Sequence, residues 1–145
     1  MKFDNYMILD FPSKSANEAF ARSAVACFAA QMDPTLEELG DIRTAVSEAV
    51  TNCIVHAYAN TIGPITLTAA LYEDGTLRVA VADKGCGIPD VSKAMEPLFT
   101  TGGAERAGLG FAVMESFMDK IKVDSKPGKG TSVTMVKKLD TYYEI

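Results

Sequence analysis

The sequence contains few residues of the kinds that build metal centres and disulfide frameworks. Its 145 residues include one histidine and three cysteines. Cys27, Cys53 and Cys86 are odd in number and far apart, which suits neither a disulfide framework nor a zinc site with closely paired ligands. We therefore expect three reduced thiols. An alternative for Cys86, which lies between two glycines of a candidate ligand loop, is an exposed thiol that senses oxidation.

Long apolar runs and clusters of basic residues are also missing. No apolar segment approaches the about 20 residues that a bilayer span needs, and no apolar signal core follows the N-terminal Met-Lys-Phe-Asp. These absences predict a cytoplasmic protein with no membrane partner. Acidic residues outnumber basic ones by 19 to 14, and the basic residues are scattered, which argues against direct nucleic-acid binding. A protein or a nucleotide is the more fitting partner.

What the sequence does contain is the composition and periodicity of a compact domain. Hydrophobic residues make up 48% and charged residues 23%, as in a typical globular chain, and the length suits one core, so we predict a single domain over residues 1–145. Apolar spacing predicts, in chain order, a strand over 3–11, helices over 15–32 and 33–60, strands over 65–72 and 77–82, a helix over 111–118, and strands over 120–124 and 131–138. These elements predict a two-layer α/β sandwich, in which helices cover one face of a mostly antiparallel, mixed sheet.

Local signals support the predicted boundaries. Ser15 and Glu18 have the S-x-x-E spacing of a capping box, and Asp33-Pro34-Thr35 can end one helix and cap the next. Asp74-Gly75 is a strong tight-turn signal between two strands. The stretch 83–108 is rich in glycine, proline and charge and is long for a connection, so we expect a binding loop or lid there.

Two polar residues on the second predicted helix are the first candidates for chemistry. Glu48 and Asn52 are four residues apart, so their side chains point the same way, and His56 continues the line. A carboxylate beside an amide oxygen suits a magnesium and nucleotide site, because Mg²⁺ takes one or two oxygen ligands from protein and the rest from phosphate and water. Glu48 could then accept a proton from an attacking hydroxyl. The alternative is a solvated helix face, and His56 alone makes a poor metal site.

A candidate ligand loop begins at Asp83, which ends a predicted strand and is followed by Gly85 and Gly87. It can present an acceptor, suited to an adenine amino group, beside a wall of bare backbone. The alternative is a plain turn. The dinucleotide-binding fingerprint fails here, because Asp90 occupies its third glycine position.

A second glycine pair, Gly108-Leu109-Gly110, directly precedes a predicted helix. Its amides and the helix N-terminus could cradle phosphate, and Arg106 and Lys84 are near enough in sequence to add positive charge. Leu109 stands where a Walker A motif has its lysine. An ATP site in this chain would therefore belong to another architecture.

Taken in chain order, these motifs resemble the N, G1, F and G2 boxes of the Bergerat-fold (GHKL) ATPases and kinases. The matching segments are Glu48 to Asn52, Asp83-x-Gly85-x-Gly87, Phe99-Thr100-Thr101 and Gly108-x-Gly110. Within that superfamily, the chain resembles the sporulation anti-sigma factors, a family of serine kinases from spore-forming bacteria. The resemblance covers nearly the whole chain, including residues 17–22, 33–35, 46–52, 97–101 and 114–119.

The resemblance implies a role for each matching residue. Glu48 would be the catalytic base toward a protein serine, Asn52 the Mg²⁺ ligand and Asp83 the adenine contact. Arg22 would contact the sigma factor and the competing anti-anti-sigma protein, whereas the residue alone reads as a solvated helix charge. The residues implied around ATP or ADP are Asn52, Asp83, Gly85, Gly87, Thr100, Thr101, Arg106, Gly108, Gly110 and Thr131.

The implied function is that of a homodimeric anti-sigma factor with kinase activity. It would bind and inhibit a sporulation sigma factor of the sigma F type, and phosphorylate the anti-anti-sigma factor on serine with ATP and Mg²⁺. One alternative is a general-stress anti-sigma serine kinase, and another is a nucleotide-gated binding module without kinase activity. A detached histidine-kinase ATPase domain is disfavoured, because the sequence shows no helical hairpin with a phosphorylatable histidine.

Overall fold

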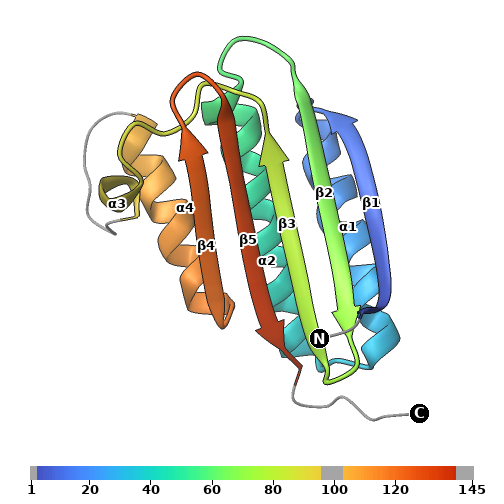
Figure 1. The fold of residues 1–145 in the computed structure, drawn as a ribbon. Coiled ribbons are helices and arrows are strands. Elements are labelled where there is room, and N and C mark those ends of the chain that lie inside the picture. Colours follow the sequence, from blue (N-terminus) through green and yellow to red (C-terminus); the bar gives the residue numbers. More distant parts are fainter. Residues whose placement is uncertain (1–2, 96–102, 140–145) are drawn as a thin grey trace.

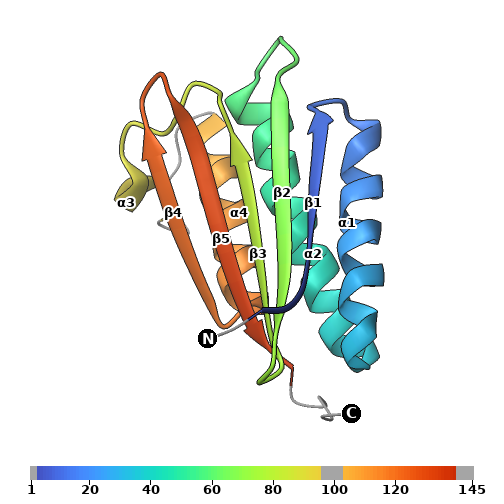
Figure 2. The same cartoon turned by 45° about the vertical axis from the view of Figure 1, so that its right-hand side comes forward.

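The computed structural model describes the backbone of residues 3–95 and 103–139 and the side chains of residues 4–95 and 110–139. A five-stranded sheet, in the order β1-β2-β3-β5-β4, carries helices α1, α2 and α4 on one face (Figures 1 and 2). The strands are β1 (Phe3–Pro12), β2 (Pro64–Tyr72), β3 (Thr76–Asp83), β4 (Lys120–Lys126) and β5 (Gly130–Lys138). The helices are α1 (Ala16–Ala29), η1 (Ala30–Met32), α2 (Leu36–Asn52), η2 (Cys53–Ala57), α3 (Val91–Ala94) and α4 (Gly103–Phe117).

The predicted two-layer α/β sandwich is confirmed, but the sheet is not mixed. Each of the four neighbouring strand pairs in the described residues is antiparallel. Helices α1 and α2, each extended by a short segment (η1 and η2), cross the sheet in opposite directions between β1 and β2, so β2 runs antiparallel to β1 (Figure 1). A single longer helix, α4, returns the chain from β3 to β4, and these two strands run parallel, but β5 lies between them.

The core lies between the sheet and the helices. Alternate residues of β2 and β3 face the helices and are at most 2% exposed: Ile65, Leu67, Ala69, Leu71, Leu77, Val79 and Val81. Helix α2 contributes a buried stripe of Ile42, Ala45, Val46, Ala49 and Val50. Each larger aliphatic side chain buried in this way stabilises the fold by about 1.5–3 kcal/mol, so α2 is held firmly against the sheet. No helix in the described ranges is both long and apolar enough for a bilayer span.

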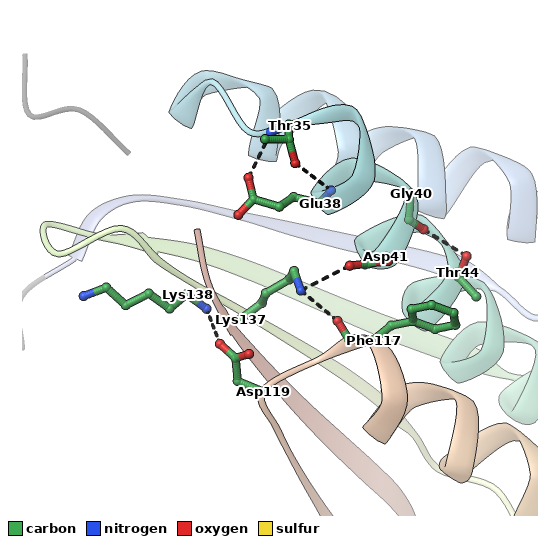
Figure 3. Close-up of polar contacts among 9 residues, drawn as sticks. All are labelled: Thr35, Glu38, Gly40, Asp41, Thr44, Phe117, Asp119, Lys137 and Lys138. Carbon is green, nitrogen blue, oxygen red and sulfur yellow. Dashed lines mark hydrogen bonds and ion pairs between the residues drawn. The ribbon is translucent and has the colours of Figure 1, made fainter. Parts of the chain in front are cut away.

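One predicted cap is present and one is absent. The Thr35 side chain accepts from the Glu38 amide at 3.0 Å, and Glu38 accepts from the Thr35 amide at 2.9 Å (Figure 3). The capping box expected at Ser15 is wrong, since the Ser15 side chain makes no capping bond to α1. Glu18 instead accepts a 2.5 Å hydrogen bond from the Ser47 hydroxyl of α2. Glu18 therefore bonds to Ser47, which is distant in sequence, in place of the local cap.

Lys137 ties β5 to two helices at the end of the sandwich where α2 begins. Its Nζ donates to the Phe117 carbonyl at 2.9 Å and lies 3.4 Å from the Asp41 carboxylate (Figure 3). The Lys137 side chain is only 12% exposed, so this pair is better shielded from water than a surface ion pair. It fixes the N-terminal part of α2 relative to the C-terminus of α4.

Helix α2 ends in a widened turn. The π-helical segment η2 follows Asn52 directly, and Tyr58 ends it, so the helix predicted to residue 60 is helical to Ala57. The Ala57 carbonyl then accepts from the Cys86 amide at 3.2 Å. This contact joins the end of η2 to the loop after β3.

Candidate active site

A cavity, partly open to solvent, lies where the C-terminal end of α2 meets the loop after β3. Four residues predicted from the sequence line it: Asn52, Asp83, Gly87 and Thr131. The rest of its wall is mainly apolar and consists of Ala49, Cys53, His56, Ala57, Cys86, Ile88, Phe111 and Val133. An apolar cavity with a few polar groups is the usual form of a small-molecule site.

The Asp83 carboxylate is held in one orientation at the wall of this cavity. Its Oδ1 accepts from the amides of Gly85 at 2.9 Å and Thr131 at 3.1 Å, and its Oδ2 accepts from the Cys53 thiol at 3.5 Å. The bond to Gly85 is that of an Asx turn. The sequence left open either a plain turn or a ligand loop at Asp83, and the structure has both a turn and a cavity there. Asp83 is therefore an oriented acceptor, which suits a donor such as an exocyclic amine.

Two neighbours of Asp83 were not predicted as part of the site. Burial is the main cause that raises the pKa of Cys53 far above its usual value, and the nearby Asp83 charge adds to it. The thiol therefore stays neutral and can donate to Asp83. Burial also raises the pKa of Tyr58, whose hydroxyl donates to the Pro64 carbonyl at 2.6 Å and accepts from the Lys84 amide at 2.6 Å. These bonds fix the Lys84 amide directly after Asp83 and the start of β2, where Ile65 pairs with Asp83.

The glycines of the loop allow close backbone contacts. A Cβ on Gly85 would collide with the Ala57 carbonyl. Gly87 has φ +74° and approaches the Lys126 carbonyl so closely that a Cβ would collide there too. The loop thus lies tightly between η2 and the β4–β5 turn, and both glycines are needed for this path.

The predicted pair on α2 meets α4. A Cβ on Gly110 would lie 3.2 Å from Glu48 Oε2 and 3.2 Å from both Asn52 Oδ1 and Nδ2. The buried Asn52 Nδ2 has no hydrogen-bond partner among the described residues. Since unsatisfied buried amides are rare, this atom, or Oδ1 if the amide is turned, is available to a ligand in the cavity.

The expectation that Gly108-Leu109-Gly110 precedes a helix is wrong. Helix α4 begins at Gly103, so this glycine pair lies inside it. The packing of Gly110 against Glu48 and Asn52 gives the physical reason for one helical glycine, because no Cβ stands between them. Thr100 and Thr101 lie outside the described residues, and so does the side chain of Arg106.

His56 lines the cavity from η2. Within residues 4–95 and 110–139, no cluster of three or more histidine, cysteine or carboxylate side chains could hold a metal ion. A Mg²⁺ ion at Asn52 would thus take most of its ligands from phosphate and water. That coordination is usual for Mg²⁺ bound with a nucleotide, so the residues present fit this ion together with ATP or ADP.

Arg22 lies on α1, outside the cavity. Its guanidinium is 3.4 Å from the Glu18 carboxylate, which also accepts from Ser47. Its buried Nε has no hydrogen-bond partner in the described part of the chain. Arg22 borders a second, open groove that also contains Glu48.

Comparison with known proteins identifies the family. The sequence matches the model of the histidine kinase-like ATPase domain over residues 11–137. The anti-sigma F factor of Caldanaerobacter subterraneus subsp. tengcongensis is 60% identical over 138 residues, which cover 94% of this chain and 96% of the relative. The anti-sigma F factor of Clostridium acetobutylicum is 55% identical over 137 residues, which cover 94% and 95%.

Solved structures share the fold at low sequence identity. The structure of the RsbU and RsbW domains of Rv1364c from Mycobacterium tuberculosis matches with a TM-score of 0.69 and 22% identity, over 93% of this chain and 32% of that one. The SiaB-SiaC complex from Pseudomonas aeruginosa matches with a TM-score of 0.61 and 15% identity, over 90% and 88%.

The recognised motifs, the antiparallel sheet with helices on one face and the similarity over nearly the full chain agree with one another. The chain belongs to the histidine kinase-like (GHKL) ATPase domain family and, within it, to the anti-sigma F factors.

Proposed function

We propose that this chain is an ATP-dependent protein serine kinase that also binds and inhibits a sporulation sigma factor, and that its substrate is the anti-anti-sigma factor. The observation that carries the kinase proposal is the meeting of Glu48, Asn52 and Gly110 beside the cavity that contains Asp83. The Glu48 carboxylate thus lies next to the ligand cavity but is not among the residues that line it with Asp83. The names of the relatives support the anti-sigma role.

The nucleotide would lie with its adenine at Asp83 and its phosphates toward Asn52. Asp83 supplies an oriented acceptor, and the apolar wall would cover the faces of the base. Asn52, which also lines the cavity, supplies an amide nitrogen without a hydrogen-bond partner among the described residues. Bound ATP with Mg²⁺ would provide the phosphoryl group and the cation that neutralises charge in the transition state.

Glu48 would act as the base toward the substrate serine. Its carboxylate lies on the groove side of α2, one turn from Asn52, and would accept the hydroxyl proton as the serine oxygen bonds to phosphorus. Phosphorylation adds about −2 charge to the substrate. Because this chain carries a net charge of −5, the phosphorylated partner should be held more weakly.

The nucleotide state would decide which partner is bound. A ligand can shift this choice only if its affinity differs between the two complexes. Arg22, at the border of the groove next to Glu48, is the residue we propose both partners contact. If pull-down recovered a general-stress sigma factor and not a sporulation one, the stress-kinase alternative would replace this assignment.

We also propose a homodimer. The face of the sheet opposite the helices has no covering element among the described residues (Figure 2), and Tyr6 and Ile8 of β1 are 60% and 57% exposed. Light scattering after size exclusion should give about twice the 15.5 kDa chain mass, and Ile8→Asp should shift it to the monomer. A monomeric wild-type protein would contradict the proposal.

The nucleotide assignment has a sharp test in Asp83→Asn. The retained Oδ1 can still accept from Gly85 and Thr131, while the acceptor Oδ2 becomes an amide donor that opposes the adenine amino group. We expect ADP affinity to fall about tenfold or more, measured by calorimetry, with thermal unfolding changed little. Unchanged ADP affinity in a folded variant would show that Asp83 does not recognise the base.

A further inference from the structure

Basic residues are scarce in the stretch of chain that contains α1 and α2. Between Lys14 and Arg78 the sequence has two basic residues, Arg22 and Arg43. The same stretch has eight acidic residues, namely Glu18, Asp33, Glu37, Glu38, Asp41, Glu48, Glu73 and Asp74. The two arginines are on different helices, yet both line one open groove between α1 and α2.

The groove follows two rows of residues on α2. Gly40, Thr44 and Glu48 are spaced four apart and form one row, and Arg43 and Ser47 form the other. Gly40 has open space where a Cβ would be, and Thr44 turns its hydroxyl back to the Gly40 carbonyl at 2.9 Å (Figure 3). The floor of the groove therefore consists of small residues, and its far end is the carboxylate of Glu48.

The positive charge in the groove is incompletely neutralised. Arg22 has Glu18 as its ion-pair partner at 3.4 Å, but its buried Nε lacks an acceptor among the described residues. Arg43 is exposed and forms no ion pair within the described ranges. The neighbouring Asp41 is engaged by Lys137 on the side toward β5 (Figure 3). The groove thus presents unmatched donors within an otherwise acidic surface.

Glu48 and Asn52 stand on consecutive turns of α2 but border different spaces. Asn52 lines the cavity with Asp83, whereas Glu48 lines the groove with Arg43. A nucleotide in the cavity and a protein segment in the groove would therefore approach the same pair of turns from two sides. This arrangement is what transfer to a protein hydroxyl needs.

We propose that this groove binds the segment of the protein substrate that carries the acceptor serine, and that Arg43, with Arg22, binds an acidic side chain next to that serine. The inference rests on the proposed kinase function and adds a specificity-determining residue to it. Arg43 would act on the docking of the substrate and not on the proton transfer, since it lies more than one turn from Glu48 on α2. Its loss should raise KM for the protein and leave kcat unchanged.

The test compares Arg43→Glu with the matched charge reversal Lys14→Glu. Lys14 is exposed and lies before α1, outside the groove. With an anti-anti-sigma protein from the same organism as substrate, we expect Arg43→Glu to raise KM about tenfold, because like charges across an interface are strongly unfavourable. The kcat and the ADP affinity should stay within twofold of wild type, and Arg43→Lys should restore most of the KM.

Direct binding of the same protein in the presence of ADP separates the possible failures. If wild type transfers phosphate and Arg43→Glu behaves like Lys14→Glu in both KM and binding, the docking inference is wrong while the kinase proposal stands. If wild type binds but transfers nothing, and Arg43→Glu alone weakens binding, the groove is a docking site and the kinase proposal fails. If wild type neither binds nor transfers, both are overturned.

Discussion

Replacing Gly110 with alanine would separate the stability of α4 from the geometry of the proposed catalytic pair. In a helix interior, alanine is more favourable than glycine by about 0.5–1 kcal/mol. The new Cβ would lie 3.2 Å from Glu48 Oε2 and from both terminal atoms of Asn52. Such overpacking usually costs about 1–3 kcal/mol. We therefore expect a net loss of stability of only about 0–2.5 kcal/mol.

The effect on catalysis should be larger than the effect on stability. The carboxylate and the amide must each move by a few tenths of an ångström to admit the methyl group, and misplacement of reacting groups by 1 Å can cost about 100-fold in rate. We expect kcat for serine phosphorylation to fall about tenfold. Single-turnover transfer from labelled ATP measures the rate, and urea unfolding measures the stability.

Gly40→Ala is the matched control for the stability term. Nothing lies within 4 Å of a Cβ on Gly40, so only the helix preference acts, and stability should rise by about 0.5–1 kcal/mol. A Gly110→Ala protein with wild-type kcat would refute the assigned geometry of the pair. A loss of stability above about 3 kcal/mol would refute the packing estimate.

Two further predictions concern the stability of the fold. Thr35→Ala should lower the free energy of unfolding by about 1 kcal/mol, because it removes the N-terminal cap of α2. Ser15→Ala should change the free energy of unfolding by less than about 0.5 kcal/mol. Equal losses for the two variants in urea unfolding would contradict this prediction. The pKa of Cys53 is raised in the folded state above the ordinary 9.0, so the unfolded chain loses this proton first and stability should fall as pH rises above 9. Between pH 9 and 10 the wild type should lose about 1 kcal/mol more than Cys53→Ala. Parallel curves for the two proteins would show that the thiol does not remain neutral in the fold.

Local sequence signals predict part of the fold correctly where no tertiary contact engages the same residues. The Asp74-Gly75 turn joins β2 and β3, and their alternating apolar residues face the helices. Thr35 caps α2 in the predicted way. At Ser15 the same kind of motif fails, because Glu18 is drawn to a residue 29 positions away in sequence. A capping box cannot reveal such a tertiary partner.

The candidate site shows the same limit. Glu48, Asn52 and Asp83 could be chosen from helical spacing and loop composition, and the structure brings Asn52 and Asp83 to one cavity. Cys53 was expected only to be a reduced thiol, because its bond to Asp83 spans 30 positions and leaves no local pattern. The glycine pair was expected before a helix, since apolar spacing predicted that helix only over 111–118. The contact of Gly110 with α2 is visible only in three dimensions.

The central claim is that this chain transfers phosphate to a protein serine with Glu48 as the base. The most direct measurement is phosphoserine formation on the anti-anti-sigma protein by wild type and Glu48→Ala, with ADP affinity measured for both. The account predicts phosphoserine with wild type, a loss of at least about 100-fold in kcat for Glu48→Ala, and ADP affinities within a few fold. Transfer at the wild-type rate by Glu48→Ala, or sigma binding by wild type without any phosphoserine, would contradict it.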